Sequence, residues 1–435
     1  MGLTDIQIYK QNRCQVIYNS RMPKKSSVVI GKLVRRIARL RGGGSALPGL
    51  VVEKIDKGFI SDCLNRLPLG VAVVSGTNGK TTTTKIVVEL LESQGLKVFT
   101  NRTGSNFMRG VIAALIESVD LNGRLDADIA VLELDEAHAV KFVQAVAPRY
   151  CLLLNVMRDQ LDRFGEIDHT ARLLADVVDA TTGTVVVNRE DRRLTALKAD
   201  SKIIYFGLSA GLIGEFPEDD ELLDQNTEKQ PSGLPADVIL SQIHGDTAEF
   251  IIDGRKASAP LSLKGSYNIF NSAAALALVR QILPDAETDS LICGLADIQS
   301  AFGRGESFVV NGQSLELFLV KNPSGFQLAL NSFGSDGHDV MIAINDNYAD
   351  GRDMSWLWNV DFSGLRSVQM VSGIRGADMA LRLKYDEVPV DNPVEPDLAA
   401  AAQKFYGLSD RPKRIFATYT AMLDIRKALK GRSIL

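Results

Sequence analysis

Cysteine is scarce in this chain, with 4 residues among 435. They are far apart and form no Cys-x-x-Cys pair, so neither a disulfide framework nor a zinc cluster is expected. Long apolar runs are also missing. None approaches the roughly 18 to 20 residues of a membrane-spanning helix, and the first residues lack the apolar core of a signal peptide. These absences predict a cytoplasmic protein that neither spans a membrane nor is exported.

A large excess of charge of either sign is absent as well. Lys and Arg number 49 against 53 Asp and Glu, and a formal net charge of −4 gives no general attraction to nucleic acid. Hydrophobic residues make up 45% and charged residues 23%, which is typical of soluble globular proteins. At 435 residues the chain exceeds what one core usually supports, so two or three domains are expected.

A local imbalance of charge lies near the N-terminus. No acidic residue occurs between Asp5 and Glu53, whereas Lys and Arg are frequent there. Four apolar residues recur in this stretch at helical spacing: Val29, Leu33, Ile37 and Leu40. The segment 1–45 is therefore predicted to hold a basic amphipathic helix. Two interpretations stay open: the helix packs on the domain behind it with its polar side in solvent, or it contacts an anionic lipid surface.

From about Leu69 short apolar runs alternate with helical segments, which indicates a parallel α/β sheet. The predicted strands are 71–75, 98–100, 129–134, 150–155, 184–188 and 203–206. An acidic, proline-containing stretch at 215–235 is interpreted as a loop or insertion. Alternating residues around Ile239 and 250–252 suggest a small antiparallel addition. A second α/β pattern begins near Phe308, so the predicted fold class is α/β with two units.

The strongest motif is Gly76-Thr77-Asn78-Gly79-Lys80-Thr81-Thr82, which follows the apolar strand 71–75 and leads directly into a helix. Glycines let such a loop present backbone N–H groups to phosphates, and the helix N-terminus adds partial positive charge. Lys80 can reach the outer phosphates of ATP, and Thr81 is placed to ligate Mg²⁺. Lys80→Ala is expected to abolish turnover with little effect on folding. The general P-loop spacing fails, because Val74 stands where its first Gly is required.

This shorter loop resembles that of Mur ligases and folylpolyglutamate synthases. The resemblance implies a Mur ligase-type central ATPase domain with a parallel sheet, plus a smaller α/β C-terminal domain. The expected boundaries are 1–45 for the basic segment, 46–300 for the central domain with an insertion at about 208–262, and 301–435 for the C-terminal domain. It also implies that Glu133, at the end of a predicted strand, binds the Mg²⁺ that bridges ATP and the acceptor carboxylate. The alternative for Glu133 is a solvated acidic turn.

Two further segments of the central domain carry the resemblance. The stretch 155–166 is similar to the family's Asn-x-x-x-Asp-His-x-Asp-Arg segment, but Gln160 replaces a His that binds metal in many Mur ligases. A second metal site is therefore expected to be weak or absent. In the stretch 264–271, the resemblance places Asn268 and Asn271 near the adenine of ATP. The alternative for Asn268 is a cap on the helix that follows.

Segments near the start of the last domain resemble those by which Mur ligases reach the nucleotide. Arg304, within Gly303 to Glu306, and the stretch 321–325 are expected near the ribose and phosphates. Here the sequence departs from the family, since Phe318 stands where Mur ligases have an acidic residue.

The stretch 345–356, together with 372–375 and 417–422, resembles the C-terminal domain of the MurT family. Members of that family pair with a GatD-type glutaminase, and the ligase subunit supplies the carboxylate that orients the glutaminase's Cys-His pair. Asp353 and Asp350 are the candidates for this catalytic role, and the alternative is an acidic loop that caps the chain or binds Mg²⁺. Many MurT proteins also carry a four-Cys zinc ribbon. We expect no zinc site, because this sequence has no Cys in the corresponding region.

The resemblance thus implies an ATP-dependent carbon–nitrogen ligase that amidates the D-glutamate α-carboxylate of lipid II to D-isoglutamine. The reaction would pass through an acyl phosphate and use ammonia from the glutaminase. Two rivals remain: a Mur-type or folylpolyglutamate-type ligase that adds an amino acid, and a scaffold that binds nucleotide without ligating. The first rival expects a UDP-binding α/β domain before the phosphate loop, whereas the 70 residues before Val71 are predicted to hold a basic helix instead. The expected location is the cytoplasm, at the inner face of the membrane if the basic helix contacts lipid.

Overall fold

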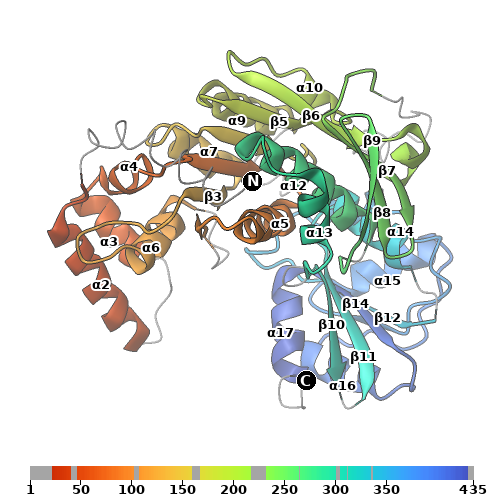
Figure 1. Cartoon of the computed structure of the whole chain (residues 1–435). Coiled ribbons are helices and arrows are strands. Elements are labelled where there is room, and N and C mark those ends of the chain that lie inside the picture. Colours follow the sequence, from red (N-terminus) through yellow and green to blue (C-terminus); the bar gives the residue numbers. More distant parts are fainter. Residues whose placement is uncertain are drawn as a thin grey trace.

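The computed structural model describes residues 22–40, 47–101, 107–158, 167–216, 232–263, 265–299, 304–310, 312–334 and 337–429. Two β-sheets form two bodies that lie side by side in Figure 1. The first sheet has the strand order β2-β3-β1-β4-β5-β6-β7-β8-β9, and the second the order β10-β11-β14-β12-β13. The predicted α/β fold, with a large parallel sheet and a smaller second unit, is confirmed.

The first sheet is parallel from β2 to β7 and antiparallel from β7 to β9. Its strands are β1 (Val71–Ser75), β2 (Val98–Phe99), β3 (Ile129–Glu133), β4 (Tyr150–Leu153), β5 (Thr184–Asn188), β6 (Lys202–Leu208), β7 (Val238–His244), β8 (Thr247–Ile252) and β9 (Arg255–Pro260). Asp253 and Gly254 join β8 to β9 with φ of 50° and 75°, the positive values that a two-residue hairpin turn needs. The predicted antiparallel addition is therefore present.

Helices cover both faces of this sheet because its central strands are apolar on both sides. Along β1, Ala72 and Val74 belong to one core cluster, whereas Val71 and Val73 belong to the other. The helices are α5 (Lys80–Ser93), α6 (Met108–Ser118), α7 (Glu136–Val143), α9 (Ile167–Asp179), α10 (Arg192–Thr195), η1 (Ala210–Glu215), α12 (Ser266–Ile282) and α13 (Thr288–Leu295). The long helix α12 packs on α5, and its alanine-rich middle is fully buried.

Three N-terminal helices form an outer layer: α2 (Lys25–Leu40), α3 (Leu47–Ile55) and α4 (Phe59–Leu64). Helix α2 packs on α3 and α6, at the end of the first body far from the second in Figure 1. The predicted basic helix is thus present and packed on the domain. However, the residues that it buries are Ser27, Val28, Gly31 and Ala38. The apolar stripe predicted from the sequence lies on the outer side.

The second sheet is built from β10 (Arg304–Val310), β11 (Gln313–Leu319), β12 (Asp339–Ala343), β13 (Met370–Ser372) and β14 (Lys413–Ala417). Strands β10 and β11 pair antiparallel, and the remaining pairs are parallel. Its helices are α14 (Pro323–Phe333), η2 (Ser355–Asn359), α15 (Gly376–Tyr385), α16 (Leu398–Tyr406) and α17 (Tyr419–Leu429). The strand predicted at 340–344 is β12, shifted by one residue.

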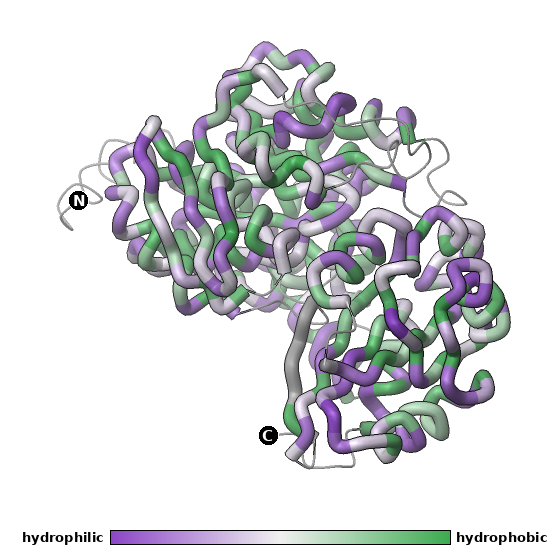
Figure 2. The backbone as a smooth tube through the Cα atoms, turned by 90° about the vertical axis from the view of Figure 1, so that its right-hand side faces the viewer, coloured by the Kyte–Doolittle hydropathy of each residue, from purple (hydrophilic) through white to green (hydrophobic). Residues whose placement is uncertain are grey.

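Hydrophobic and hydrophilic residues interleave along both bodies, as Figure 2 shows. Among the residues that the structure describes, no helix combines the length and the hydropathy needed to cross a membrane.

The described cysteines differ in their surroundings. Cys63 and Cys151 are buried, and burial raises the pKa of each thiol to about 12. Cys293 lies exposed on α13.

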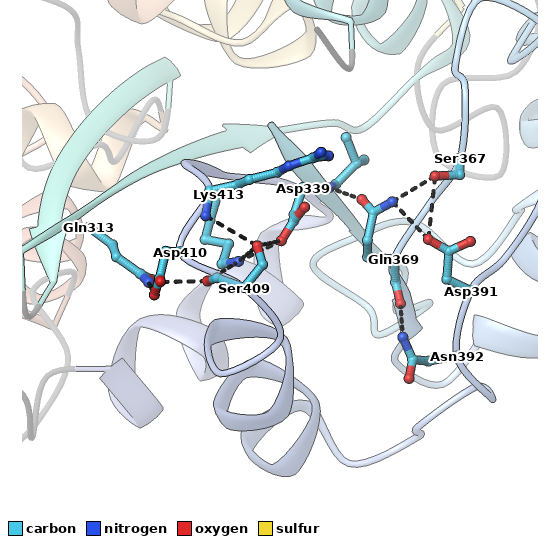
Figure 3. A network of polar contacts seen from close by, with 11 residues as sticks. Gln313, Asp339, Ser367, Gln369, Asp391, Asn392, Ser409, Asp410 and Lys413 are labelled. Carbon is cyan, nitrogen blue, oxygen red and sulfur yellow. Dashed lines mark hydrogen bonds and ion pairs between the residues drawn. The ribbon is translucent and has the colours of Figure 1, made fainter. Parts of the chain in front are cut away.

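A polar network closes one edge of the second sheet, where β12 and β14 begin (Figure 3). The Lys413 ammonium is fully buried and lies 2.5 Å from Asp339 Oδ2, and it also donates to the Ser409 carbonyl at 2.9 Å. Since ligands in open α/β sheets bind at the opposite, carboxyl edge, we assign this network a structural role.

Candidate active site

The predicted phosphate loop lies between the end of β1 and the start of α5. Gly76 and Gly79 adopt φ of 124° and 88°, which side-chain-bearing residues rarely reach. A Cβ atom on Gly79 would lie 2.6 Å from Asn271 Oδ1. Helix α5 begins at Lys80, and the first backbone N–H groups of a helix have no partner within it. The loop is therefore shaped as an anion cradle at a helix N-terminus.

Asn155, at the end of β4, holds this loop in place. Its carbonyl accepts from Thr77 N at 3.0 Å, and its side chain accepts from Asn78 N at 2.8 Å and donates to Asn78 O at 3.1 Å. The Thr77 hydroxyl accepts from Met157 N at 3.0 Å. The N–H groups of Thr77 and Asn78 both donate to Asn155, so Thr77 and Asn78 anchor the loop and do not offer these groups to phosphate. The N–H groups available to phosphate lie from Gly79 through the first turn of α5.

Lys80 is buried and lies over the loop. Its ammonium donates to the Gly76 carbonyl and to the Thr77 carbonyl, and it lies 3.5 Å from Glu136 Oε2. Burial alone would raise the pKa of Glu136, but the charges of Lys80 and Lys321 and hydrogen bonding hold it below the ordinary value. This contact leads to a prediction different from the sequence-based one: Lys80→Ala should also lower stability, because it would leave Glu136 buried without its ion-pair partner.

The two predicted magnesium ligands lie together. The Thr81 hydroxyl donates to Glu133 Oε1 at 2.9 Å. Asn101 fixes the end of β3 by accepting from Glu133 N at 3.0 Å and donating to Glu133 O at 2.8 Å. Hydroxyl and carboxylate oxygens are the hard ligands that Mg²⁺ prefers, so this pair fits the ion.

The described residues supply few protein ligands for a metal ion. Over the described ranges, no group of three or more His, Cys, Asp or Glu side chains could hold a metal, so Mg²⁺ here would complete its shell with phosphate and water. Gln160, which replaces the family's His, lies outside the described residues.

A cavity with aromatic walls lies beside the loop, at the carboxyl ends of β4, β5 and β6. Its lining includes Phe216, Tyr267, Phe270, Glu190 and Asn271. Asn271 Nδ2 and Glu190 Oε2 are buried there, and neither has a hydrogen-bond partner among the described residues. Buried polar atoms are normally satisfied, so this donor and this acceptor indicate a ligand with complementary groups.

Asn268 and Thr82 occupy other positions. Helix α12 begins at Ser266 after Gly265, so Asn268 lies in its first turn and is not the helix cap. It lines a second cavity, shared with Lys321 of the second body. Thr82 is buried within α5, and its hydroxyl has no hydrogen-bond partner in the described part of the chain.

The second body contacts the phosphate loop through the stretch after β11. Asn78 and Asn322 exchange two side-chain hydrogen bonds, at 3.2 and 3.0 Å. Lys321 Nζ donates to the Thr77 carbonyl at 3.3 Å. Asn322 Oδ1 also accepts from Gly325 N at 2.8 Å and so caps α14. The two bodies therefore meet at the loop itself, as the family segments at 321–325 imply.

Two further residues singled out in the sequence, Arg304 and Phe318, lie on the first two strands of the second body. Arg304 begins β10, and its side chain lies outside the described part of the structure. Phe318, which replaces an acidic residue of Mur ligases, is buried and stacks on Phe416 with ring centroids 5.4 Å apart. The departure thus serves the core of the second body.

The two aspartates predicted from the sequence both lie in the acidic loop after β12, but their surroundings differ. Asp350 is buried and accepts from Thr420 N at 2.8 Å, from the Thr420 hydroxyl at 2.5 Å and from Asn347 N at 3.2 Å. Burial raises its pKa above the ordinary value, although these hydrogen bonds act in the opposite direction. Asp353 is half-buried and accepts from Ser355 N at 2.9 Å. Asp350 is thus committed within the fold.

Comparison with known protein families identifies two domains in this chain. The Mur ligase middle domain model matches residues 74–279, and the MurT ligase C-terminal model matches residues 319–422. The chain therefore combines a Mur ligase middle domain with a MurT-type C-terminal domain. These domains, with the relatives that share them, confirm the predicted ATP-dependent ligase.

Two curated relatives match over most of their length. This Mur ligase is 29% identical over 432 residues to the subunit MurT of lipid II isoglutaminyl synthase (glutamine-hydrolyzing) from Streptococcus pneumoniae, covering 90% of this chain and 94% of that protein. It is 29% identical over 420 residues to the subunit of the same name from Staphylococcus aureus strain COL, covering 88% of this chain and 92% of that protein.

A solved structure shows the same fold. The MurF ligase of Thermotoga maritima in complex with ADP aligns with a TM-score of 0.63 at 16% identity, covering 88% of this chain and 84% of that chain.

Sequence reasoning left some site residues unassigned. The sequence marks Asn155 only as part of a family segment, yet it holds the loop with three hydrogen bonds. Glu136 and Glu190 carried no motif of their own. Their position at strand ends was the only signal in the sequence.

Proposed function

We propose that this Mur ligase is the ligase subunit of a lipid II isoglutaminyl synthase. It would convert the α-carboxylate of the precursor's D-glutamate into the amide of D-isoglutamine. The observation that carries the proposal is the MurT-type C-terminal domain joined to a Mur ligase ATPase domain, in a chain that matches two such subunits almost from end to end.

The chemistry divides into two balanced steps. In the first, a carboxylate oxygen of D-glutamate attacks the γ-phosphorus of ATP, ADP leaves, and an acyl phosphate forms. In the second, ammonia attacks the acyl carbon, phosphate leaves with the bonding electrons, and the nitrogen loses a proton. Forming the acyl phosphate replaces an oxide, a poor leaving group, with phosphate.

The chain's own residues supply charge and position. Lys80 and the N-terminus of α5 would neutralise negative charge that moves between the oxygens during phosphoryl transfer. Thr81 and Glu133 would hold Mg²⁺, which supplies further charge neutralisation when bound. Glu136 keeps Lys80 at the loop through their ion pair.

The aromatic cavity suits the base of ATP. Adenine offers a ring nitrogen as acceptor and an amino group as donor, and these complement the unpaired Asn271 Nδ2 and Glu190 Oε2. Phe270 and Tyr267 supply apolar walls for the ring. Asn268, which lines the cavity shared with Lys321, and Arg304, at the start of β10, would then lie near the ribose and phosphates.

The ammonia would come from a GatD-type glutaminase bound to the second body. A Cys-His pair in such an enzyme gains from a carboxylate that fixes the imidazole tautomer. Of the two candidates, Asp353 suits this role better, because Asp350 is buried and already accepts three hydrogen bonds. If the substrate is the lipid-linked precursor, as proposed, the protein would act at the cytoplasmic face of the membrane.

The decisive test is mass-spectrometric detection of amidated lipid II after incubation with ATP and Mg²⁺. Four reactions are compared: ammonia or glutamine as nitrogen source, each with and without the glutaminase. Amidation from ammonia by this chain alone, and from glutamine only with the partner, is expected. Addition of an amino acid in place of ammonia, or nucleotide binding without any amidation, would overturn the proposal.

A further inference from the structure

Helix α2 turns its small residues toward the domain and its large apolar residues outward, the reverse of a helix that only packs on the core. Its buried residues are small or short: Ser27, Val28, Gly31 and Ala38. Gly31 permits close approach, since a Cβ atom there would lie 2.9 Å from Val52. The Ser27 hydroxyl donates to Asp56 Oδ2 at 2.8 Å and fixes the helix on the domain. These contacts hold the helix on the domain through its buried side and leave its outward side available for a different contact.

The outward side carries the larger apolar residues. They recur at intervals of three and four and form the apolar stripe: Val29, Leu33, Ile37 and Leu40. Leu33 is 56% exposed and Leu40 82% exposed. Ile30 is exposed beside them. Single exposed apolar residues are ordinary, but a continuous row along about three turns of one helix indicates a contact surface.

Cations line one border of the apolar stripe. Lys25, Lys32, Arg36 and Arg39 follow one another at helical spacing on that side. The helix contains no acidic residue. The carboxylates that contact it lie near its buried side: Asp56 accepts from Ser27, and Glu117 of α6 pairs with Arg35 and Arg39. The outward side thus combines a hydrophobic sector with a strongly positive sector.

We infer that the outward side of α2 binds the surface of an anionic lipid bilayer, with the helix axis parallel to the membrane. An interfacial helix needs an apolar side that enters the acyl boundary and cations that meet the headgroups, and this helix has both sectors. The charge complementarity favours an anionic surface. A protein partner is the less favoured occupant, because the stripe is a convex row of aliphatic side chains without the aromatic anchors typical of interfaces.

This inference rests on the proposed function for its purpose, since a lipid-linked substrate lies in such a membrane. Helix α2 would hold the ligase at the surface where that substrate is found. The phosphate loop and the junction with the second body remain free, because α2 lies at the far end of the first body (Figure 1).

The test is cosedimentation of the full chain with vesicles. One set contains about one-third phosphatidylglycerol in phosphatidylcholine, and the other phosphatidylcholine alone. Binding to the anionic vesicles is expected, with a loss of at least about tenfold for Leu33→Glu/Ile37→Glu. Lys25→Gln/Arg36→Gln should weaken binding by roughly 25-fold at low salt, from about fivefold for each cation. Leu381→Glu is the matched control, because Leu381 is an exposed leucine on α15 of the second body.

Amidation of a short-chain, water-soluble lipid II analogue is measured in parallel. The stripe variants should retain wild-type activity on it, which shows that they fold and that the ligase itself is intact. Equal binding to both vesicle types, or undiminished binding by the stripe variants, would overturn the inference. The inference would also be overturned if the chain did not bind vesicles but dimerised through the apolar stripe, as measured by light scattering. Loss of amidation in the wild type would count against the proposed function alone.

Discussion

Asn322→Ala should uncouple the second body from the phosphate loop. Asn322 is 1% exposed and Asn78 3% exposed, and their two mutual hydrogen bonds join the bodies at this point. The variant loses the cap of α14, worth about 1 kcal/mol. It also removes the Asn322 partner of the buried Asn78 Oδ1 and leaves Asn78 Nδ2 with only the weak acceptor Met157 Sδ at 3.4 Å, at a cost of about 1 to 3 kcal/mol. The free energy of unfolding should therefore fall by about 2 to 4 kcal/mol.

The chain provides its own probe and control. Both Trp residues of the sequence, Trp356 and Trp358, lie in the second body, so tryptophan fluorescence in urea follows the unfolding of that body. Asp397→Ala removes a cap of the same kind from α16, where Asp397 accepts from Ala400 N at 2.7 Å, away from the loop. The control should lose about 1 kcal/mol and keep its activity.

Activity should separate the two variants. For Asn322→Ala, kcat/KM for ATP should fall by roughly 5- to 150-fold, which corresponds to about 1 to 3 kcal/mol of lost coupling. The reasoning is refuted if both variants lose the same stability, or if kcat/KM of Asn322→Ala stays within about twofold of the wild type.

Three further predictions concern single contacts. Lys80→Ala should lower kcat by at least about 100-fold and, by stranding Glu136, also reduce stability; adding Glu136→Gln should restore the melting temperature but not the turnover. Asp353→Asn should abolish amidation from glutamine while amidation from ammonia stays normal, whereas Asp350→Ala should mainly destabilise the protein; equal loss with both nitrogen sources for Asp353→Asn would contradict the assignment. Burial tends to raise the pKa of Asp339, but hydrogen bonds from Lys413 and Ser409 and the charge of Lys413 hold it below the ordinary value. Its contribution to stability is thus complete above about pH 4 and lost as pH falls through the lower folded pKa; Asp339→Asn should remove this dependence in urea titrations from pH 2 to 7 and cost about 3 to 5 kcal/mol at neutral pH, because Lys413 stays buried.

The sequence predicted the regular elements well where local patterns are strong. The apolar runs at 71–75 and 184–188 coincide with β1 and β5. The small antiparallel addition predicted around 250–252 is also present, and it turns at Asp253 and Gly254, one of the few residue pairs that tolerate two positive φ values. The phosphate loop could be recognised because its glycines are required by the backbone.

Contacts between distant segments were beyond the same reasoning. The spacing of Val29, Leu33, Ile37 and Leu40 predicts a helix with an apolar side, but not which side meets the domain. Gly31 decides that, since α3 can approach only where no side chain intervenes. Asn155 and Asn78 lie 77 residues apart, and Asn78 and Asn322 lie 244 apart, so no local pattern links them.

The free thiol on α13 has a practical consequence. Cys293 lies on the last helix of the first body before the chain enters the second, whereas Cys63 and Cys151 resist alkylation because burial holds both in the protonated form. In a Cys14→Ser background, a maleimide acceptor dye should therefore attach at one defined point on the first body. The tryptophans on η2 supply donors on the second body. Energy transfer from these native donors to the single dye would report whether nucleotide draws the two bodies of the ligase together.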